Sequence, residues 1–569
     1  MHGMNGMHGS DGRPRANAQA PAGSPGVGAG DGAPDPRRWL ALIVIDLCLL
    51  AVTMDNTILN VALPTIARDL SATGSQLQWM VDAYIVVFAG LLLTAGTLGD
   101  RLGRRRLLLA GLTVFGFASA STLLVRSPEQ LIAIRGLMGL GGALLMPATL
   151  SLITNLFPAS ERPRAIATWA AVSGLGMVIG PILGGALLDG FGWNSVFMVN
   201  VPVAAVGILG TLVLMPESRD PRPGRLDPIG ALLSIAGLAV LVYGIIEAPA
   251  PGWTAPETIV RIGVGLAFVA AFVVWELHNR EPMFDIGLFG RPAFGATSFA
   301  ETVAHFALVG TMFALTQYLQ FVWGQSPIEA GISMMPIAVG VIGGTILVTR
   351  LQGRIGSRYL IAGGLSGIAI GLFLISRLTV DSPYVLFAAI LAFLSGGMGL
   401  AMAPATDSIM GAVDKERAGV GSATNDTTRE LGSALGVAVF GSLISSAYRD
   451  SLATRLAEIP GGIGGLPPAV GGAVRDSIGS AVVAAGQLPG GTGTAVLDAA
   501  RGAFVSGMST ATVVGAAIVA AGVIVLLHWL PDAKPASEPA AETDGRPARG
   551  VRFGRGAVSG SGRNGAAAS

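Results

Sequence analysis

Charged residues and cysteine are both scarce in this sequence. Only 12% of the 569 residues are charged, and Cys48 is the single cysteine. A disulfide framework and a cysteine-based metal site are therefore excluded, and we expect no metal and no cofactor. Lys415 and Lys534 are the only lysines, and neither follows a glycine, so the chain has no G-x-x-x-x-G-K-[ST] phosphate-binding loop. If this chain moves a solute uphill, it must use an ion gradient or a partner ATPase.

Apolar residues dominate the composition instead. They make up 51% of the chain, and the mean hydropathy is +0.63, whereas an ordinary soluble domain has about 25% charged residues. The sequence therefore predicts a multi-pass membrane protein whose surroundings are a lipid bilayer. The net charge of +1 gives no reason to expect a nucleic acid partner. Residues 1–38 contain no apolar stretch, so we interpret them as a disordered tail and not as a signal peptide.

Fourteen apolar segments have the length, about 20 residues, that crosses roughly 30 Å of hydrocarbon. They lie near 40–62, 78–98, 107–125, 130–155, 165–188, 195–215, 228–246, 257–276, 296–322, 329–349, 359–377, 384–410, 420–447 and 506–530. With the amino terminus inside, the cytoplasmic segments hold 26 of the 36 Lys and Arg residues. This bias predicts that both termini lie in the cytoplasm.

Two short patterns recur in the same order along the chain. Arg101-x-Gly103-x-Arg105 recurs as Arg354-x-Gly356-x-Arg358, 253 residues later, and the Pro147–Ser151 pattern recurs at Pro404–Ser408, 257 residues later. The repeat predicts two six-helix halves with two extra helices between them and a substrate site at the midplane. The expected divisions are 1–38 (tail), 39–215 (first half), 216–280 (linker helices), 281–530 (second half with an external loop at 448–505) and 531–569 (tail). We interpret the external loop as a surface cap, with a lid as the alternative, and expect weak helices at 468–487 and 494–505.

A basic turn joins the second and third apolar segments. Its glycines permit a tight turn, and its arginines must lie in water or among lipid headgroups. The sequence Gly96-Thr97-Leu98-Gly99-Asp100-Arg101-Leu102-Gly103-Arg104-Arg105-Arg106 resembles the loop between helices 2 and 3 of the major facilitator superfamily. The resemblance implies that Asp100 and Arg101, with Gly96, Gly103, Arg104 and Arg105, close the cytoplasmic side and release it during transport.

The first apolar segment carries an acid. Met54-Asp55-Asn56-Thr57-Ile58-Leu59-Asn60-Val61-Ala62-Leu63-Pro64 resembles the L-D-x-T-I-V-N-V-A-L-P signature of the fourteen-helix drug/proton antiporters of this superfamily. An acid within a spanning helix must face a wet cavity, pair with a cation or take up a proton. Asp55 is therefore the first candidate for proton or cation binding. The alternative is a buried acid that only braces a neighbouring helix.

Arg135 lies near the external end of the fourth segment, in the same half of the bilayer as Asp55, so an ion pair is plausible. Arg135-Gly136-Leu137-Met138-Gly139 resembles the family pattern R-x-x-Q-G, whose arginine is associated with proton relay. Met138 replaces the family glutamine. This departure puts any polar network through the missing amide in doubt.

Three further stretches resemble the same family. Gly176-x-x-x-Gly180-Pro181-x-x-Gly184-Gly185 is similar to the helix 5 motif that marks exporters, although plain tight packing would also explain it. Trp193–Pro202 is similar to W-R-W-I-F-L-I-N-V-P, and we interpret it as structural, with Trp193 as an interfacial anchor. In the second half, Tyr318–Gly331 and Arg429–Ala438 are similar to the turn after the half's first helix and to the helix 13 motif R-E-L-G-x-A-L-G-x-A.

Other intramembrane polar residues are weaker candidates. Glu430 is a second candidate for proton or cation binding, and a brace between helices made with Arg429 is the alternative. Glu301 and His305 lie four residues apart on one helix face and could relay protons, or only line a cavity. Asp82 could join Asp55 or reach water. Asp46 lies half a helical turn away from Asp55, so these two acids cannot line the same face.

These observations predict an all-α membrane protein with the major facilitator fold and fourteen transmembrane helices. The resemblance implies a secondary transporter of the EmrB/QacA-like branch, which exports drugs or antibiotics across the bacterial cytoplasmic membrane in exchange for protons. We expect a monomer whose partners are a small organic substrate and protons. The alternatives are a proton-coupled importer and a membrane receptor or scaffold without transport. An enzyme is not expected, because no nucleophile and base pair is present.

Overall fold

The computed structural model describes residues 37–158, 160–219, 226–280, 282–352, 354–413, 418–458 and 468–531. Within these ranges the chain forms helices and no strands. Thirteen helices are long and apolar enough to cross a membrane, and one further pair, bent by 42° within α5, brings the total to fourteen spans. The predicted helix class and number are confirmed. The predicted tails lie, except for residues 37, 38 and 531, outside the described residues.

The elements follow one another in the predicted order. The first group contains α1 (Arg38–Asp69), α2 (Gly74–Leu102), α3 (Arg104–Ser121), α4 (Pro128–Leu156), α5 (Arg162–Phe191), α6 (Ser195–Met198) and α7 (Asn200–Leu214). Two helices follow, α8 (Pro228–Ile246) and α9 (Pro256–His278). The second group contains α10 (Pro292–Gln317), a π-helical turn (Tyr318–Val322), α11 (Pro327–Ser333), α12 (Pro336–Leu351), α13 (Ser357–Ile375), α14 (Tyr384–Gly411), α15 (Ala418–Ala457), α16 (Pro468–Asp476), α17 (Ile478–Ala485) and α18 (Gly490–Trp529).

Local sequence signals explain where several helices begin and end. Thr73 and Ser326 form capping boxes with Gln76 and Glu329, which satisfy free backbone N–H groups at the starts of α2 and α11. Gly103 alone separates α2 from α3, with φ +113°, a backbone conformation that side-chain-bearing residues rarely adopt. The basic turn is therefore a tight hairpin, as its glycines predicted.

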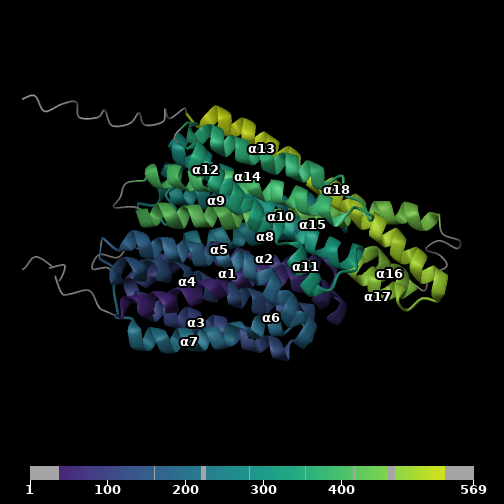
Figure 1. The fold of residues 1–569 in the computed structure, drawn as a ribbon, viewed down its shortest axis with the longest axis horizontal. Coiled ribbons are helices and arrows are strands. Elements are labelled where there is room, and N and C mark those ends of the chain that lie inside the picture. Colours follow the sequence, from purple (N-terminus) through teal and green to yellow (C-terminus); the bar gives the residue numbers. More distant parts are fainter. Residues whose placement is uncertain are drawn as a thin grey trace, which may run out of the picture.

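Figure 1 shows two helical bundles lying side by side, with α8 between them. The first bundle contains α1–α7, and the second contains α10–α18 without the short helices α16 and α17, which we call the cap. The cap lies at one end of the molecule, the cap end, and contacts α1 as well as α15 and α18. The Arg101–Arg106 turn lies at the opposite end, the arginine end.

Two predicted helix boundaries were wrong at the cap end. The helix predicted for 506–530 begins at Gly490 instead, and the helix predicted to stop at 447 continues to Ala457. Residues 494–505, predicted as a separate weak helix, are therefore part of α18. Ala499, Ala500 and Ala503 are buried there, because α18 packs against α15 beyond the length that a bilayer requires. The other weak helices, predicted for 468–487, are present as α16 and α17.

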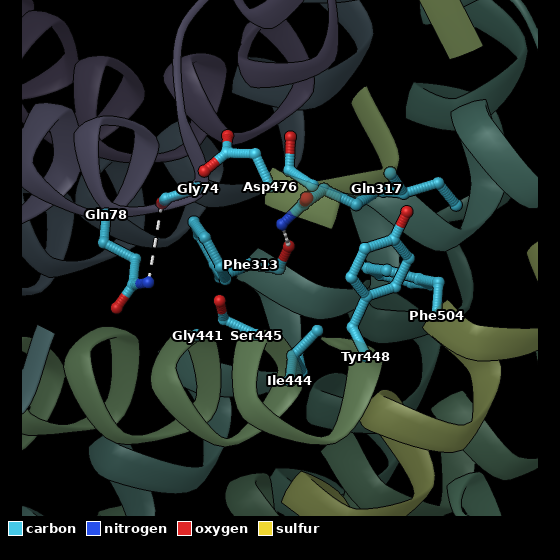
Figure 2. A pocket seen from close by; sticks show the side chains of 12 residues that line it. Gly74, Gln78, Phe313, Gln317, Gly441, Ile444, Ser445, Tyr448, Asp476 and Phe504 are labelled. Carbon is cyan, nitrogen blue, oxygen red and sulfur yellow. Dashed lines mark hydrogen bonds between the residues drawn. The ribbon is translucent and has the colours of Figure 1, made fainter. Parts of the chain in front are cut away.

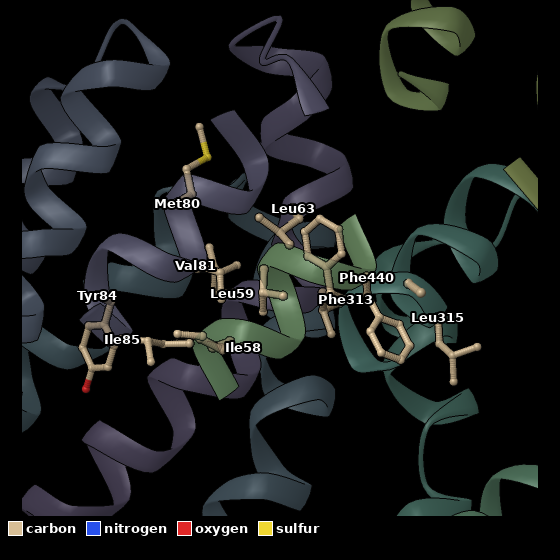
Figure 3. Packing of buried hydrophobic residues seen from close by; sticks show 14 of the residues in the cluster. Ile58, Leu59, Leu63, Met80, Val81, Tyr84, Ile85, Phe313, Leu315 and Phe440 are labelled. Atoms are coloured by element: carbon tan, nitrogen blue, oxygen red, sulfur yellow. The ribbon is translucent and has the colours of Figure 1, made fainter. Parts of the chain in front are cut away.

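The two bundles are joined at the cap end. Gln320 Nε2 donates to the Val61 carbonyl oxygen at 2.8 Å, and Ser442 Oγ lies 3.3 Å from Gln78 Oε1. A β-carbon at Gly185 would lie 2.5 Å from the Ile328 Cα atom, so α5 and α11 approach backbone to backbone. Figure 3 shows apolar side chains of both bundles meeting in the same core, among them Ile58, Leu59, Phe313 and Phe440. Nearer the arginine end, α5 is less covered by neighbouring helices, since Leu175 is 53% exposed there.

Candidate functional site

Asp55 forms a buried ion pair in the middle of the first bundle. Its Oδ2 atom lies 2.5 Å from Arg135 Nη1 on α4, and its Oδ1 atom accepts a hydrogen bond of 3.0 Å from Asn200 Nδ2 on α7. Asp55 and Asn200 are fully buried, and Arg135 is 1% exposed. The predicted pairing of the acid with the arginine is present, and three separate helices hold the carboxylate.

Arg135 is held on all sides. Its Nε atom donates to the Met80 carbonyl oxygen at 2.9 Å, and its guanidinium lies 4.5 Å from the centre of the Tyr84 ring and 6.0 Å from that of Phe197. These contacts lower the energy of a cation that has almost no access to water. Met138, which stands where the family has glutamine, is fully buried and brings no polar group to the site.

Asn200 is a site residue that our interpretation of the sequence missed. We took Trp193–Pro202 as structural, yet α7 begins at Asn200, and this position aims the amide at Asp55. The signal that could have found it is the polar Asn before Val-Pro in an otherwise apolar stretch. Trp193 itself is 6% exposed and packs edge-on against Phe197, so it is a core residue and not an anchor facing headgroups.

A second polar cluster lies in the other bundle, where Arg429 on α15 meets Glu301 and His305 on α10. Arg429 Nε donates to His305 Nε2 at 3.1 Å, and His305 Nδ1 lies 2.9 Å from the Glu301 carbonyl oxygen. Because a guanidinium only donates, Nε2 is the acceptor and Nδ1 carries the hydrogen, so His305 is neutral here. The Glu301 carboxylate instead accepts from Thr406 on α14 at 2.8 Å and lies 3.8 Å from Arg429.

The brace in this cluster is made by Arg429. It joins α15 to α10 and also lies 3.7 Å from Asp426 on its own helix. Glu430 projects about 100° away from Arg429 around the helix. Within the described residues, no hydrogen bond or ion pair joins the Glu430 carboxylate to a neighbour, and its role in proton or cation binding stays a prediction.

Asp82 and Asp46 are further buried acids. Asp82 is fully buried on α2, and neither carboxylate oxygen has a hydrogen-bond partner among the described residues. We expected Asp82 either to join Asp55 or to reach water, and it does neither. Asp46, on α1, is 7% exposed and is likewise separate from the Asp55 pair.

A small cavity lies between the bundles at the cap end, as Figure 2 shows. Its volume is about 30 Å³, and it is lined by residues of α2, α10, α15, α18 and the cap, including Gln78, Gln317 and Asp476. Burial raises the pKa of Asp476 above its ordinary value, and the Arg449 guanidinium, 4.0 Å away, partly opposes this shift. The described residues contain no group of three or more His, Cys, Asp or Glu side chains that could hold a metal ion.

The fold and these sites agree with the comparison with known proteins. A family model described as Major Facilitator Superfamily matches residues 45–437. The chain belongs to this superfamily. It is 38% identical to the multidrug efflux pump LfrA of Mycolicibacterium smegmatis, over 86% of this chain and 96% of the relative. It is 32% identical to the tetracenomycin C resistance and export protein of Streptomyces glaucescens, over 86% of this chain and 91% of the relative.

The solved structures give the same fold. A bacterial homologue of the human lysosomal transporter Spinster, in an inward-facing and unoccupied conformation, aligns with a TM-score of 0.61 at 20% identity. The alignment covers 88% of this chain and 98% of that one. The family model and the efflux relatives, and not this alignment, identify the chain as a multi-pass membrane transporter of the drug-efflux family and not an enzyme.

The superfamily's basic turn is tied to its own bundle here. Asp100 pairs with Arg104 at 2.8 Å, and the Arg104 N–H donates to the Ser218 carbonyl oxygen at 3.0 Å. Arg105 Nη2 donates to the Leu212 carbonyl oxygen at 2.7 Å. The turn thus rests on the chain that leaves α7. Its role as a gate remains a prediction.

The helix 5 motif packs against both bundles. β-Carbons at Gly176 and Gly180 would lie 2.1 and 2.0 Å from the hydroxyl oxygens of Thr53 and Thr57 on α1, and one at Gly184 would lie 2.5 Å from Ile58. Pro181 is in turn approached by Gly331 of α11, whose β-carbon would lie 2.3 Å from the Pro181 carbonyl oxygen. The motif therefore holds α5 against α1 and meets the second bundle at the cap end.

Proposed function

We propose that this protein exports drugs or antibiotics across the bacterial cytoplasmic membrane in exchange for protons. The observation that carries the proposal is the buried ion pair of Asp55 and Arg135, held by Asn200. A carboxylate with no access to water changes its proton occupancy only together with its partner, so protonation of Asp55 must release Arg135. The named activities of the efflux relatives support export as the direction.

In this mechanism, a proton arriving from outside neutralises Asp55 and breaks its attraction to Arg135. The guanidinium is then free to move, and the change of charge weakens cargo binding and allows the bundles to rock. Release of the proton inside restores the pair. Each charge that crosses 100 mV supplies about 2.3 kcal/mol toward this cycle.

We take the arginine end as cytoplasmic, as the charge bias predicts, and we therefore treat this conformation, closed at the cap end, as inward-facing. The side chains of Arg429 and Asp426 are 31% and 33% exposed, and Glu430 is adjacent to Arg429 in the chain. These acids favour a cationic cargo. Glu301 and His305 hold Arg429 in place, and in this conformation the neutral His305 accepts a hydrogen bond instead of carrying a transferable charge.

The proposal is tested with inside-out vesicles that are energised to build a proton gradient. Addition of cationic and neutral drugs is expected to release protons from vesicles containing the native chain. Asp55→Asn should abolish this release, whereas Asp46→Asn, the same change at a buried acid on another face of α1, should retain it. If Asp55→Asn released as many protons as Asp46→Asn and the native chain, Asp55 would not lie on the proton path. Drug accumulation that rises in cells expressing the protein would favour import.

A further inference from the structure

We propose that Asp82 is a second proton-binding site, which must be protonated before the cap end can close. The side chain is fully buried, and neither carboxylate oxygen has a hydrogen-bond partner among the described residues. An ionised carboxylate in such a place would cost several kcal/mol, whereas a protonated one is far less costly. In the closed conformation Asp82 therefore carries a proton.

The position of Asp82 links this proton to the contact between bundles. Gln78, one helical turn earlier on the same face of α2, meets α15, where Ser442 Oγ lies 3.3 Å away and a β-carbon at Gly441 would lie 2.4 Å from the Gln78 side chain. Ser442 Oγ also donates to the Ile245 carbonyl oxygen of α8 at 2.8 Å. α2 packs against both α15 and α8, and Asp82 lies one turn beyond Gln78 on the same side of α2, so we infer that separating α2 from α15 would expose Asp82.

A small cavity lies on the cap-end side of this acid without reaching it. The cavity of about 30 Å³ is lined by Gln78 and lies between α2, α15 and the cap. One water molecule needs roughly 10–15 Å³ of such space, so the cavity is large enough for water. Asp476 also lines the cavity (Figure 2), and Asp82 lies one helical turn beyond Gln78 along α2.

The other charges on neighbouring helices are too distant or already paired to neutralise Asp82. α8 contains no charged residue or histidine, and Arg135 of α4 is paired with Asp55 of α1. On α15, Ser442 lies beside Gln78, and Asp82 lies about 6 Å deeper, so Arg429 and Arg449 are about 14 and 16 Å from the level of Asp82 along the helix axis. Arg429 is also held by Glu301 and Asp426, and Glu430, about 12 Å away, is an acid and cannot neutralise Asp82. The nearest charges of α3 are the arginines of the basic turn at the far end of α2. A proton is therefore the ligand that fits this acid.

The consequence is an ordered cycle. When the cap end opens, Asp82 meets water and ionises as any exposed carboxyl does near neutral pH. Closure then requires a proton from the external side, so the protein cannot return to the inward-facing state without taking one up. This role in the cycle rests on the proton exchange proposed above, whereas the titration of closure itself does not.

Closure is measured by spin-label distances in lipid nanodiscs without drug. Labels at Arg68→Cys and Asp381→Cys, both exposed at the cap end of different bundles, report the closed fraction in a Cys48→Ala background. Between pH 5 and 8, the ratio of closed to open protein is expected to fall by up to about tenfold per pH unit, the limit for one proton. Asp82→Asn and Asp82→Leu should stay closed at every pH, and Asp46→Asn should behave like the parent.

A pH response that is unchanged in both Asp82 variants would overturn the proposal, and so would a parent protein whose closed fraction ignores pH. Neither result depends on Asp55. If drug-driven proton release fails in vesicles while closure still titrates through Asp82, the proposed antiport is wrong and the Asp82 site stands. If drug-driven proton release depends on Asp55 but closure does not change in the Asp82 variants, the proposed antiport stands and the Asp82 site is wrong.

Discussion

Breaking the Asp55–Arg135 pair distinguishes a transport site from a structural brace. Asp55→Asn leaves the Arg135 guanidinium 1% exposed, with only the Met80 carbonyl oxygen and the aromatic rings as partners. Removing one member of a buried ion pair costs about 3–5 kcal/mol. We expect about 3 kcal/mol here, because Asn200 and the new amide still satisfy part of the site. Arg135→Gln should cost a similar amount, since it leaves the Asp55 carboxylate with Asn200 alone.

The double variant carries the decisive information. Asp55→Asn with Arg135→Gln leaves two neutral amides within hydrogen-bond reach and no buried charge. Its free energy of unfolding is measured in mixed micelles with increasing SDS. It should be about 2–3 kcal/mol higher than the value expected if the losses of the two single variants simply added. Drug-driven proton release should be absent in all three variants. A double variant that is stable and transports like the native protein would show that the pair is only a brace.

Three further predictions follow from particular contacts. Gly180→Ala forces a methyl group to 2.0 Å from Thr57 Oγ1 and should cost about 1–3 kcal/mol in unfolding, whereas Gly174→Ala on the same helix, with no atom within 4 Å, should be neutral or stabilising. Gln320→Leu removes the hydrogen bond to the Val61 carbonyl oxygen, worth about 1 kcal/mol, and should shift the spin-label equilibrium roughly two- to tenfold toward an open cap end. The control is Gln317→Leu, because among the described residues the Gln317 amide donates only to Phe313 of its own helix. Equal shifts in the two variants would show that the Gln320–Val61 hydrogen bond does not hold the cap end closed. Asp100→Asn should lower turnover more than drug binding, measured by flux and by equilibrium binding, and unaltered flux relative to Asp69→Asn would exclude a gating role.

Much of the fold was predictable because membrane spans leave a strong one-dimensional signal. The helix class, their number and the hairpin at Gly103 follow from apolar length and from a turn that only glycine allows. The ends of α15 and α18 were not predictable in the same way. Beyond the bilayer, these helices continue because alanines such as Ala500 pack against a neighbouring helix, and hydropathy does not record such a contact.

The sequence predicts how deep each site residue lies in the membrane, but it does not predict which residues of equal depth are in contact. Asp55 and Arg135 were placed in the same half of the membrane by counting along antiparallel helices, and the structure joins them. Asn200 was missed because 145 residues separate it from Asp55 and because aromatic and apolar neighbours suggested a packing role. Its part in the site depends on the packing of α7 beside α1, which brings its amide within 3.0 Å of the Asp55 carboxylate.

The two bundles bury their charges differently, and this difference explains why protonation of Asp55 alone is not expected to control the opening and closing of the bundles. In the first bundle, Asp55 and Arg135 neutralise each other, so the site is stable only while both charges or neither are present. In the second, Arg429 bridges Glu301, His305 and Asp426 and stays about one-third exposed, so its charge is shared among several groups and is not fully buried. Asp82, on α2 of the first bundle, has no hydrogen-bond partner within the part of the chain that the structure describes. We therefore expect protonation to be coupled to the movement of the bundles most directly at Asp82, because this carboxylate must lose its charge before α2 can pack against α15.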